Sequence, residues 1–200
     1  IGMLAQDIES PFFTRVIRGI EDGLKGSGYA PIIVSGHWNQ SEELERVGLL
    51  MARRIDGLVI LNGSLSDEQI LDISRRQPVV ATGRRLEGRN LKTLRLDNEQ
   101  GGYMAASHLL SLGHRRIALI NGDTVSTFAA DRDSGYHTML KARGLAADPA
   151  LIGRGAFTDE TGFRLMQAFL ALPAPPTAVI AGSMMSALGA MRAIRIAGLA

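Results

Sequence analysis

The residues that could do chemistry in this 200-residue chain form no familiar catalytic motif. There is no phosphate-binding Gly-x-x-x-x-Gly-Lys-Ser/Thr, no metalloprotease-type His-Glu-x-x-His and no Gly-x-Ser-x-Gly nucleophile turn. Gly26-Ser27-Gly28 follows a predicted helix, whereas a dinucleotide-binding turn follows a strand. The chain has no cysteine, and its four histidines lack the spacing of metal ligands. We therefore expect no enzyme, no bound metal and no cofactor.

A binding site for a small molecule is better supported, because polar and aromatic residues recur where predicted strands end. In open α/β sheets, ligands bind beyond the carboxyl ends of the strands. Rings at this edge can stack on the apolar face of a ligand while a few polar groups fix its orientation. The segments at these predicted strand ends are 6–13, 35–39, 62–64, 83–85, 121–132, 157 and 182–185.

The elements that must position these segments are clearest between residues 97 and 122. Asp97 or Asn98 can cap a helix whose apolar residues follow helical spacing, and Gly113 supplies the left-handed residue that ends it. The unbroken apolar run 117–120 is typical of a strand that is covered on both faces. The stretch therefore predicts one helix-to-strand link of a parallel sheet.

The same alternation continues along the chain. Strands are predicted at 1–5, 32–34, 58–61, 79–81, 93–96, 117–120, 151–155 and 178–181. Further helices are predicted at 12–24, from a cap at Ser41, from Asp67, and at 132–142, 158–172 and 186–196. The alternation implies an α/β protein in which helices flank doubly wound, mostly parallel sheets. A break near Asp97 divides two similar lobes, 1–97 and 98–200.

Composition and charge argue against several other classes of protein. With 46% hydrophobic residues, the chain can bury one large core or two smaller ones. The net charge is only +2 and the basic residues are scattered, which indicates solvated faces more than a DNA-binding surface. No apolar run approaches the roughly 20 residues needed to span a bilayer, and no secretory leader is visible, so we expect a cytoplasmic protein without membrane contact.

Five short motifs together resemble the effector-binding core of LacI/GalR-family transcription regulators. In chain order they are Ser10-Pro11-Phe12-Phe13, Arg53-Arg54-Ile55-Asp56-Gly57, Asp97-Asn98 with Leu112-Gly113-His114-Arg115-Arg116-Ile117, Arg132 with Gly135-Tyr136, and Pro176 with Ala178-Val179. The resemblance covers nearly the whole chain and implies the periplasmic-binding-protein type I fold, with a small sugar-like effector bound between the two lobes. A solute-binding protein of a sugar transport system shares this fold and is the alternative.

The resemblance also implies partners. Operator DNA would be bound through a helix-turn-helix headpiece that this chain lacks, and the C-terminal lobe would be incomplete, so we expect a fragment of a longer regulator. Family members pair as homodimers. Here the helix 41–51 carries Leu49 and Leu50 beyond one core stripe, which makes this helix our expected dimer surface.

Residue roles follow from the resemblance, each beside a structural alternative. Phe12 or Phe13, and Phe157, match ring positions that touch the effector, although one of the first two should be core and Phe157 also suits the core. Arg132 matches an arginine that clasps ligand hydroxyls or carboxylates. Because Arg132 opens a predicted helix, where a cation opposes the helix dipole, its placement also suggests a functional reason. Asp97 suits a helix cap and a pocket equally.

Two departures from the family pattern change the expected effector. Ser183-Met184 stands where the family commonly has Asn-Asp, and Gly83-Arg84-Arg85 stands where it often has Asp-Arg-Pro. The replaced acidic residues can accept hydrogen bonds from sugar hydroxyls in relatives. Their loss, with Arg84 and Arg132 present, favours an anionic or less hydroxylated effector over a neutral sugar.

Overall fold

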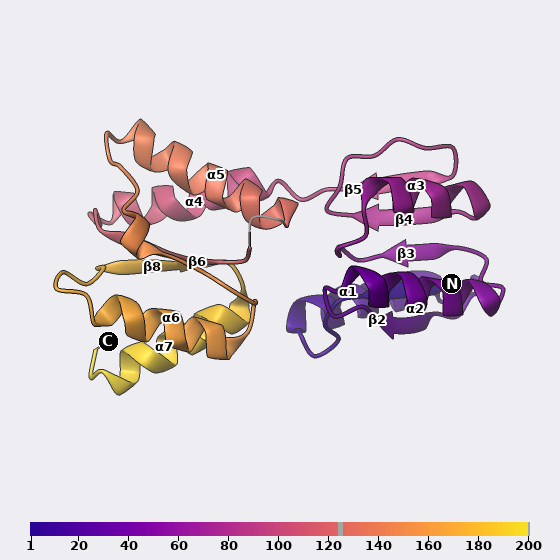
Figure 1. Ribbon diagram of the computed structural model, residues 1–200, viewed down its shortest axis with the longest axis horizontal. Coiled ribbons are helices and arrows are strands. Elements are labelled where there is room, and N and C mark those ends of the chain that lie inside the picture. Colours follow the sequence, from indigo (N-terminus) through magenta and orange to yellow (C-terminus); the bar gives the residue numbers. More distant parts are fainter. Residues whose placement is uncertain (124–125, 200) are drawn as a thin grey trace. The chain divides into compact units, whose positions relative to one another are not determined.

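The computed structural model describes residues 1–123 and 126–199 as two compact units, Ile1–Leu96 (unit 1) and Asp97–Ala200 (unit 2). Residues 124 and 125, inside the predicted ligand-binding segment 121–132, lie outside the described residues, as does residue 200. Each unit is a parallel sheet with helices on both faces (Figure 1). The predicted α/β class with mostly parallel sheets is confirmed.

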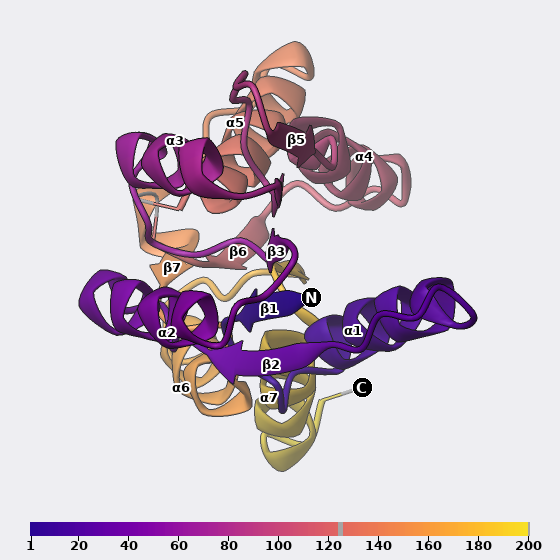
Figure 2. The same cartoon turned by 90° about the vertical axis from the view of Figure 1, so that its right-hand side faces the viewer.

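Unit 1 has five parallel strands in the order β2-β1-β3-β4-β5. Its elements are β1 (Gly2–Ala5), α1 (Pro11–Leu24), β2 (Ile32–Ser35), α2 (Gln40–Ala52), β3 (Leu58–Ile60), α3 (Asp67–Arg76), β4 (Val79–Thr82) and β5 (Leu91–Leu94). Figure 2 shows α2 and α3 on one side of this sheet and α1 on the other. Successive strand residues serve opposite layers: Leu4 packs with Ile70 of α3, whereas Met3 packs with Phe13 of α1.

Unit 2 has three parallel strands in the order β7-β6-β8. Its elements are α4 (Asn98–Ser111), β6 (Ile117–Asn121), α5 (Thr127–Ala142), a short 3-10 turn (Pro149–Leu151), β7 (Ile152–Arg154), α6 (Asp159–Leu170), β8 (Ala178–Ala181) and α7 (Met184–Ile196). Ile117 and Leu119 of β6 pack in the layer of α4 and α5, whereas Ala118 and Ile120 pack in the layer of α6 and α7 (Figure 1).

Several predicted boundaries are wrong, among them the start of the helix predicted at 186–196, which begins at Met184. The helix predicted from Arg132 begins at Thr127, because no glycine or proline interrupts the preceding turn. Arg132 therefore lies in the second turn, and the argument that it opposes the dipole at a helix start fails. Asn39, not Ser41, caps α2, since its Oδ1 accepts the amides of Ser41 and Glu42. The strand predicted at 93–96 lies at Leu91–Leu94, where it pairs with β4.

The segment that begins β6 is fixed by two arginines. Arg115 Nη1 donates to the carbonyl oxygen of Leu110 at the end of α4, 3.1 Å away. Arg116 donates to the carbonyl oxygen of Ala174 at 2.6 Å and to the carboxylate of Asp148 at 2.8 Å. The motif that carries the family resemblance therefore ties together the amino end of the sheet, opposite its carboxyl edge.

The paired helices of unit 2 touch backbone to backbone. A Cβ at Gly102 of α4 would overlap the carbonyl oxygen of Arg132, and a Cβ at Gly135 of α5 would overlap that of Glu99. The other layer repeats this arrangement. There a Cβ at Gly162 of α6 would overlap the carbonyl oxygen of Ser186, and one at Gly189 of α7 would overlap that of Asp159. Only glycine permits crossings this close.

Gly102→Ala should therefore destabilise unit 2, by about 1–3 kcal/mol, because the added methyl group meets fixed backbone atoms. Its neighbour Gly101 has open space around its Cα, so Gly101→Ala should stabilise the same helix by roughly 0.5–1 kcal/mol. Urea unfolding followed by circular dichroism measures both changes. Equal effects of the two substitutions would contradict the close crossing.

Candidate functional site

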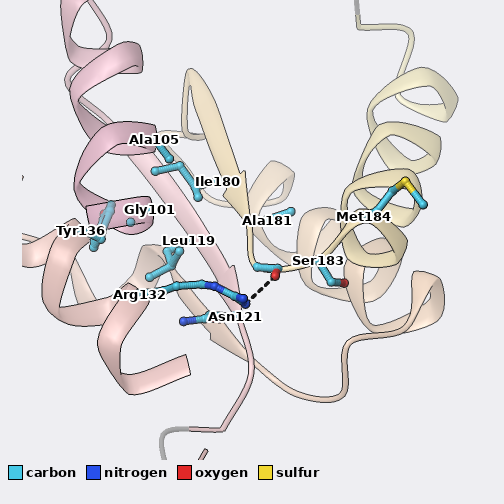
Figure 3. Close-up of a pocket in the computed structure, with 12 residues that line it drawn as sticks. Gly101, Ala105, Leu119, Asn121, Arg132, Tyr136, Ile180, Ala181, Ser183 and Met184 are labelled. Carbon is cyan, nitrogen blue, oxygen red and sulfur yellow. Dashed lines mark hydrogen bonds between the residues drawn. The ribbon is translucent and has the colours of Figure 1, made fainter. Parts of the chain in front are cut away.

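A hollow of about 360 Å³ lies at the carboxyl edge of the unit 2 sheet, against α4, α5 and the start of α7 (Figure 3). This is the edge at which ligands bind in open α/β sheets. The residues that line it are Gly101, Gly102, Ala105, Leu119, Asn121, Arg132, Tyr136, Ile180, Ala181, Gly182, Ser183 and Met184.

Arg132 is the charged side chain of this hollow. Its Nε donates to Asn98 Oδ1 at 3.2 Å. Its Nη1 donates to the carbonyl oxygen of Gly182 at 2.7 Å (Figure 3). Burial lowers the pKa of the guanidinium, but an arginine remains charged in proteins. Among residues 1–123 and 126–199, no hydrogen-bond partner is found for Nη2. One edge of the fork is thus available to a ligand.

Two aromatic rings lie beneath this guanidinium. The Cζ atom of Arg132 is 5.3 Å from the centre of the Phe128 ring and 6.0 Å from that of Phe157. The two rings stack on each other with centres 5.6 Å apart. Gly122 makes room for Phe157, since a Cβ there would meet its ring. The rings hold the cation by cation–π attraction and offer a stacking surface.

Ser183 and Met184 line the hollow in different ways. Ser183 caps α7: its Oγ accepts the amide of Ser186 at 3.0 Å and lies 3.3 Å from the carbonyl oxygen of Phe157, to which it donates. This hydroxyl is therefore already used by the fold. Met184 begins α7 and is 56% exposed, so it presents an apolar surface.

The remaining predicted residues lie elsewhere. Asp97 caps α4, accepting the amide of Gln100 at 2.9 Å, which confirms its predicted capping role. Phe13 is a core residue of unit 1, whereas Phe12 is half exposed with its ring edge-on to that of Phe13. Arg84 donates to the carboxylate of Asp67 and to the backbone of unit 1. The structure thus brings together Arg132, Phe157, Ser183 and Met184 of the eight predicted residues.

A buried carboxylate shapes the corresponding edge of unit 1. Glu43 is fully buried and accepts the amides of Ser64 at 2.8 Å and Leu65 at 3.0 Å. Its burial raises its pKa, and the two amide hydrogen bonds and the charge of Arg84 oppose this shift only in part. Glu43 therefore ties α2 to the loop that follows β3.

Phe128 and Asn121 are site residues that were not singled out from the sequence. Phe128 precedes Arg132 by one helical turn, a spacing that becomes visible only once α5 is known to begin at Thr127. Asn121 ends the buried strand β6 and was placed only within the broad segment 121–132. Its position gave no sign that its side chain is buried.

Two further properties concern residues 1–123 and 126–199. No three histidine, aspartate or glutamate side chains among them come together as a metal site. No helix among them has the length and apolar character required to cross a membrane.

Comparison with known proteins places these features in a family. Residues 1–200 match the family described as periplasmic binding proteins and sugar binding domain of LacI family. The chain is 35% identical to the HTH-type transcriptional repressor CytR of Escherichia coli (strain K12) over 199 residues, which are 98% of this chain and 58% of CytR. It is 49% identical to the HTH-type transcriptional regulator AglR of Rhizobium meliloti (strain 1021) over 124 residues, 62% of this chain and 35% of AglR.

Solved structures agree. A sugar-binding transcriptional regulator of the LacI family from Escherichia coli, complexed with phosphate, gives a TM-score of 0.81 at 26% identity, covering 100% of this chain and 73% of that one. The chain thus spans only part of these relatives, about three fifths of the length of CytR. The predicted family is confirmed: this chain belongs to the family of periplasmic binding proteins and LacI-type sugar-binding domains.

Proposed function

We propose that this chain is the effector-binding core of a LacI-type transcriptional regulator. The observation that carries the proposal is Arg132, which lies over two stacked rings at the carboxyl edge of unit 2 with its Nη2 available. A ring platform beside a guanidinium suits a small ligand with an apolar face and oxygen atoms at its rim. The family and its named regulators support this function over that of a transport solute-binding protein.

The chemistry of the hollow favours a sugar derivative that carries negative charge. A guanidinium edge can donate two parallel hydrogen bonds to a carboxylate or phosphate. Ser183 is engaged as a helix cap and Met184 is apolar, so neither adds a free acceptor for sugar hydroxyls. We propose binding without catalysis. The prediction that Phe12, Phe13, Arg84 and Asp97 also contact the effector stays a prediction.

The proposed output is a change in DNA binding. Operator DNA would be contacted by a part of the protein outside these 200 residues. An effector can shift the regulator between two states only by as much as its affinity for them differs. Ligand contacts at the second turn of α5 are suited to this role, because that turn reaches α4 and the end of β8 through Arg132.

Removing Arg132 tests the site directly. Arg132→Ala should lose charge-assisted hydrogen bonds to the ligand of about 1.5–3 kcal/mol, or roughly ten- to more than hundredfold in Kd. Calorimetric titration with glucose, sucrose, gluconate and glucose 6-phosphate measures the change, which should be largest for the anionic compounds. Arg75→Ala, which removes an exposed ion pair of unit 1, is the control. Tight binding of a neutral sugar that is unchanged by Arg132→Ala would contradict the site assignment.

Two substitutions of Phe157 distinguish its role in ligand stacking from its role in the core. The half-buried ring packs against Gly122 and Phe128, so Phe157→Ala should lower both ligand affinity and the unfolding temperature. Phe157→Leu retains most of the apolar volume and should lower affinity with a smaller loss of stability. Thermal unfolding and titration of both variants measure the two effects. If Phe157→Leu binds as tightly as the parent chain, the ring has no stacking role.

We also propose a homodimer that uses α2. Leu44 and Leu49 are 40% and 46% exposed, whereas Leu50 is 1% exposed and belongs to the core, which corrects its predicted place on the outer surface. Leu49→Asp should shift the protein toward monomer in light scattering, since a charge at a two-fold contact meets its own copy. Leu112→Asp alters a more exposed leucine, of unit 2, and should leave the mass unchanged. A parent protein that is monomeric at all concentrations would refute the proposal.

A further inference from the structure

We infer that a polar network of the buried Asn121 and Asp133 with the partly exposed Arg154 positions Arg132 for its ligand, an inference that rests on the proposed function. Asn121 Nδ2 donates to the carboxylate of Asp133 at 2.7 Å and to the carbonyl oxygen of Ala129 at 2.9 Å. Arg154 forms an ion pair with the other oxygen of Asp133. The three side chains come from the end of β6, the second turn of α5 and the end of β7.

The network holds the segment of α5 that carries Arg132 through other elements than those that Arg132 itself contacts. Asp133 follows Arg132 in the sequence, yet it reaches β6 and β7, whereas Arg132 reaches α4 and the end of β8. The bond from Asn121 to Ala129 O fixes the first turn of α5 as well. That turn carries Phe128, the ring that lies under the guanidinium. The turns of α5 that carry Phe128 and Arg132 are thus held by polar contacts to the ends of β6 and β7.

Because Asn121 and Asp133 are buried, the loss of either partner would be costly. Asn121 is 2% exposed and Asp133 is 6% exposed, and a buried carboxylate without a partner is strongly unfavourable. Asn121 Oδ1 is buried and accepts no hydrogen bond from residues 1–123 and 126–199, so the side chain serves through its two Nδ2 donors. An apolar side chain would fill the end of a buried strand more easily. The hydrogen bonds among Asn121, Asp133 and Arg154 instead fix the orientation of α5, as supporting side chains do around binding sites.

Arginine side-chain NMR tests this positioning without knowledge of the effector. The Nε–Hε signal of Arg132, assigned by its loss in Arg132→Lys, reports the hydrogen bond to Asn98 and the two rings nearby. Asp133→Asn should move this signal by more than its linewidth and speed its exchange with water, since the carboxylate no longer pairs with Arg154. Arg154→Gln should do the same, and Arg154→Lys, which keeps the positive charge, should restore most of the parent signal.

The control is Asp148→Asn, which breaks an ion pair with Arg116 at the other end of the same unit and should leave the Arg132 signal in place. If Asp133→Asn does not fold, the two Arg154 variants carry the test, because that side chain is partly exposed. An unchanged Arg132 signal in folded Arg154→Gln would overturn the inference. Calorimetric titration with glucose 6-phosphate on the same samples distinguishes the positioning network from the proposed function. If the Arg132 signal shifts but no ligand binds, only the proposed function is refuted.

Discussion

Direct contact between helix backbones is the constraint on which the site in unit 2 depends. Gly102 and Gly135 let α4 and α5 approach until no side chain separates them, and Gly162 and Gly189 do the same for α6 and α7. This closeness brings the first turn of α4 within reach of Arg132, so that Asn98 can accept its Nε–H. Gly102 and Gly135, which have no side chain, thus set the position of the Arg132 guanidinium.

The site balances a buried charge by several modest interactions. Burial disfavours the Arg132 guanidinium, and two hydrogen bonds to neutral oxygens with two ring faces offset that cost. None of these partners carries a full negative charge. Arg154, by contrast, is paired with the carboxylate of Asp133. Of these two arginines, the one that lines the hollow therefore keeps a positive charge that an anionic ligand can neutralise.

The sequence could predict features that depend on local spacing. The run Ile117–Ile120 is a buried strand and Asp97 is a cap, because short-range patterns determine both. The start of α5 could not be predicted from its weak boundary signals, and Phe128 was overlooked with it. The Asp133–Arg154 pair joins residues 21 positions apart, and no local pattern reveals such a contact. The segment around Arg116 could be recognised from its motif. Its contacts hold the amino end of the sheet, however, so the motif carries no information about the effector.

Glu43 gives unit 1 an unusual response to acid. Most carboxylates that matter to a fold have lowered pKa values, so proton uptake removes their contribution as the pH falls. The pKa of Glu43 is raised instead, so the folded chain takes up this proton before the unfolded chain does. Its contribution is fully present below the unfolded value of 4.5 and is lost as the pH rises through the folded value. Mild acid therefore relieves the cost of burying the charge of Glu43, although the amide bonds from Ser64 and Leu65 favour the ionised carboxylate.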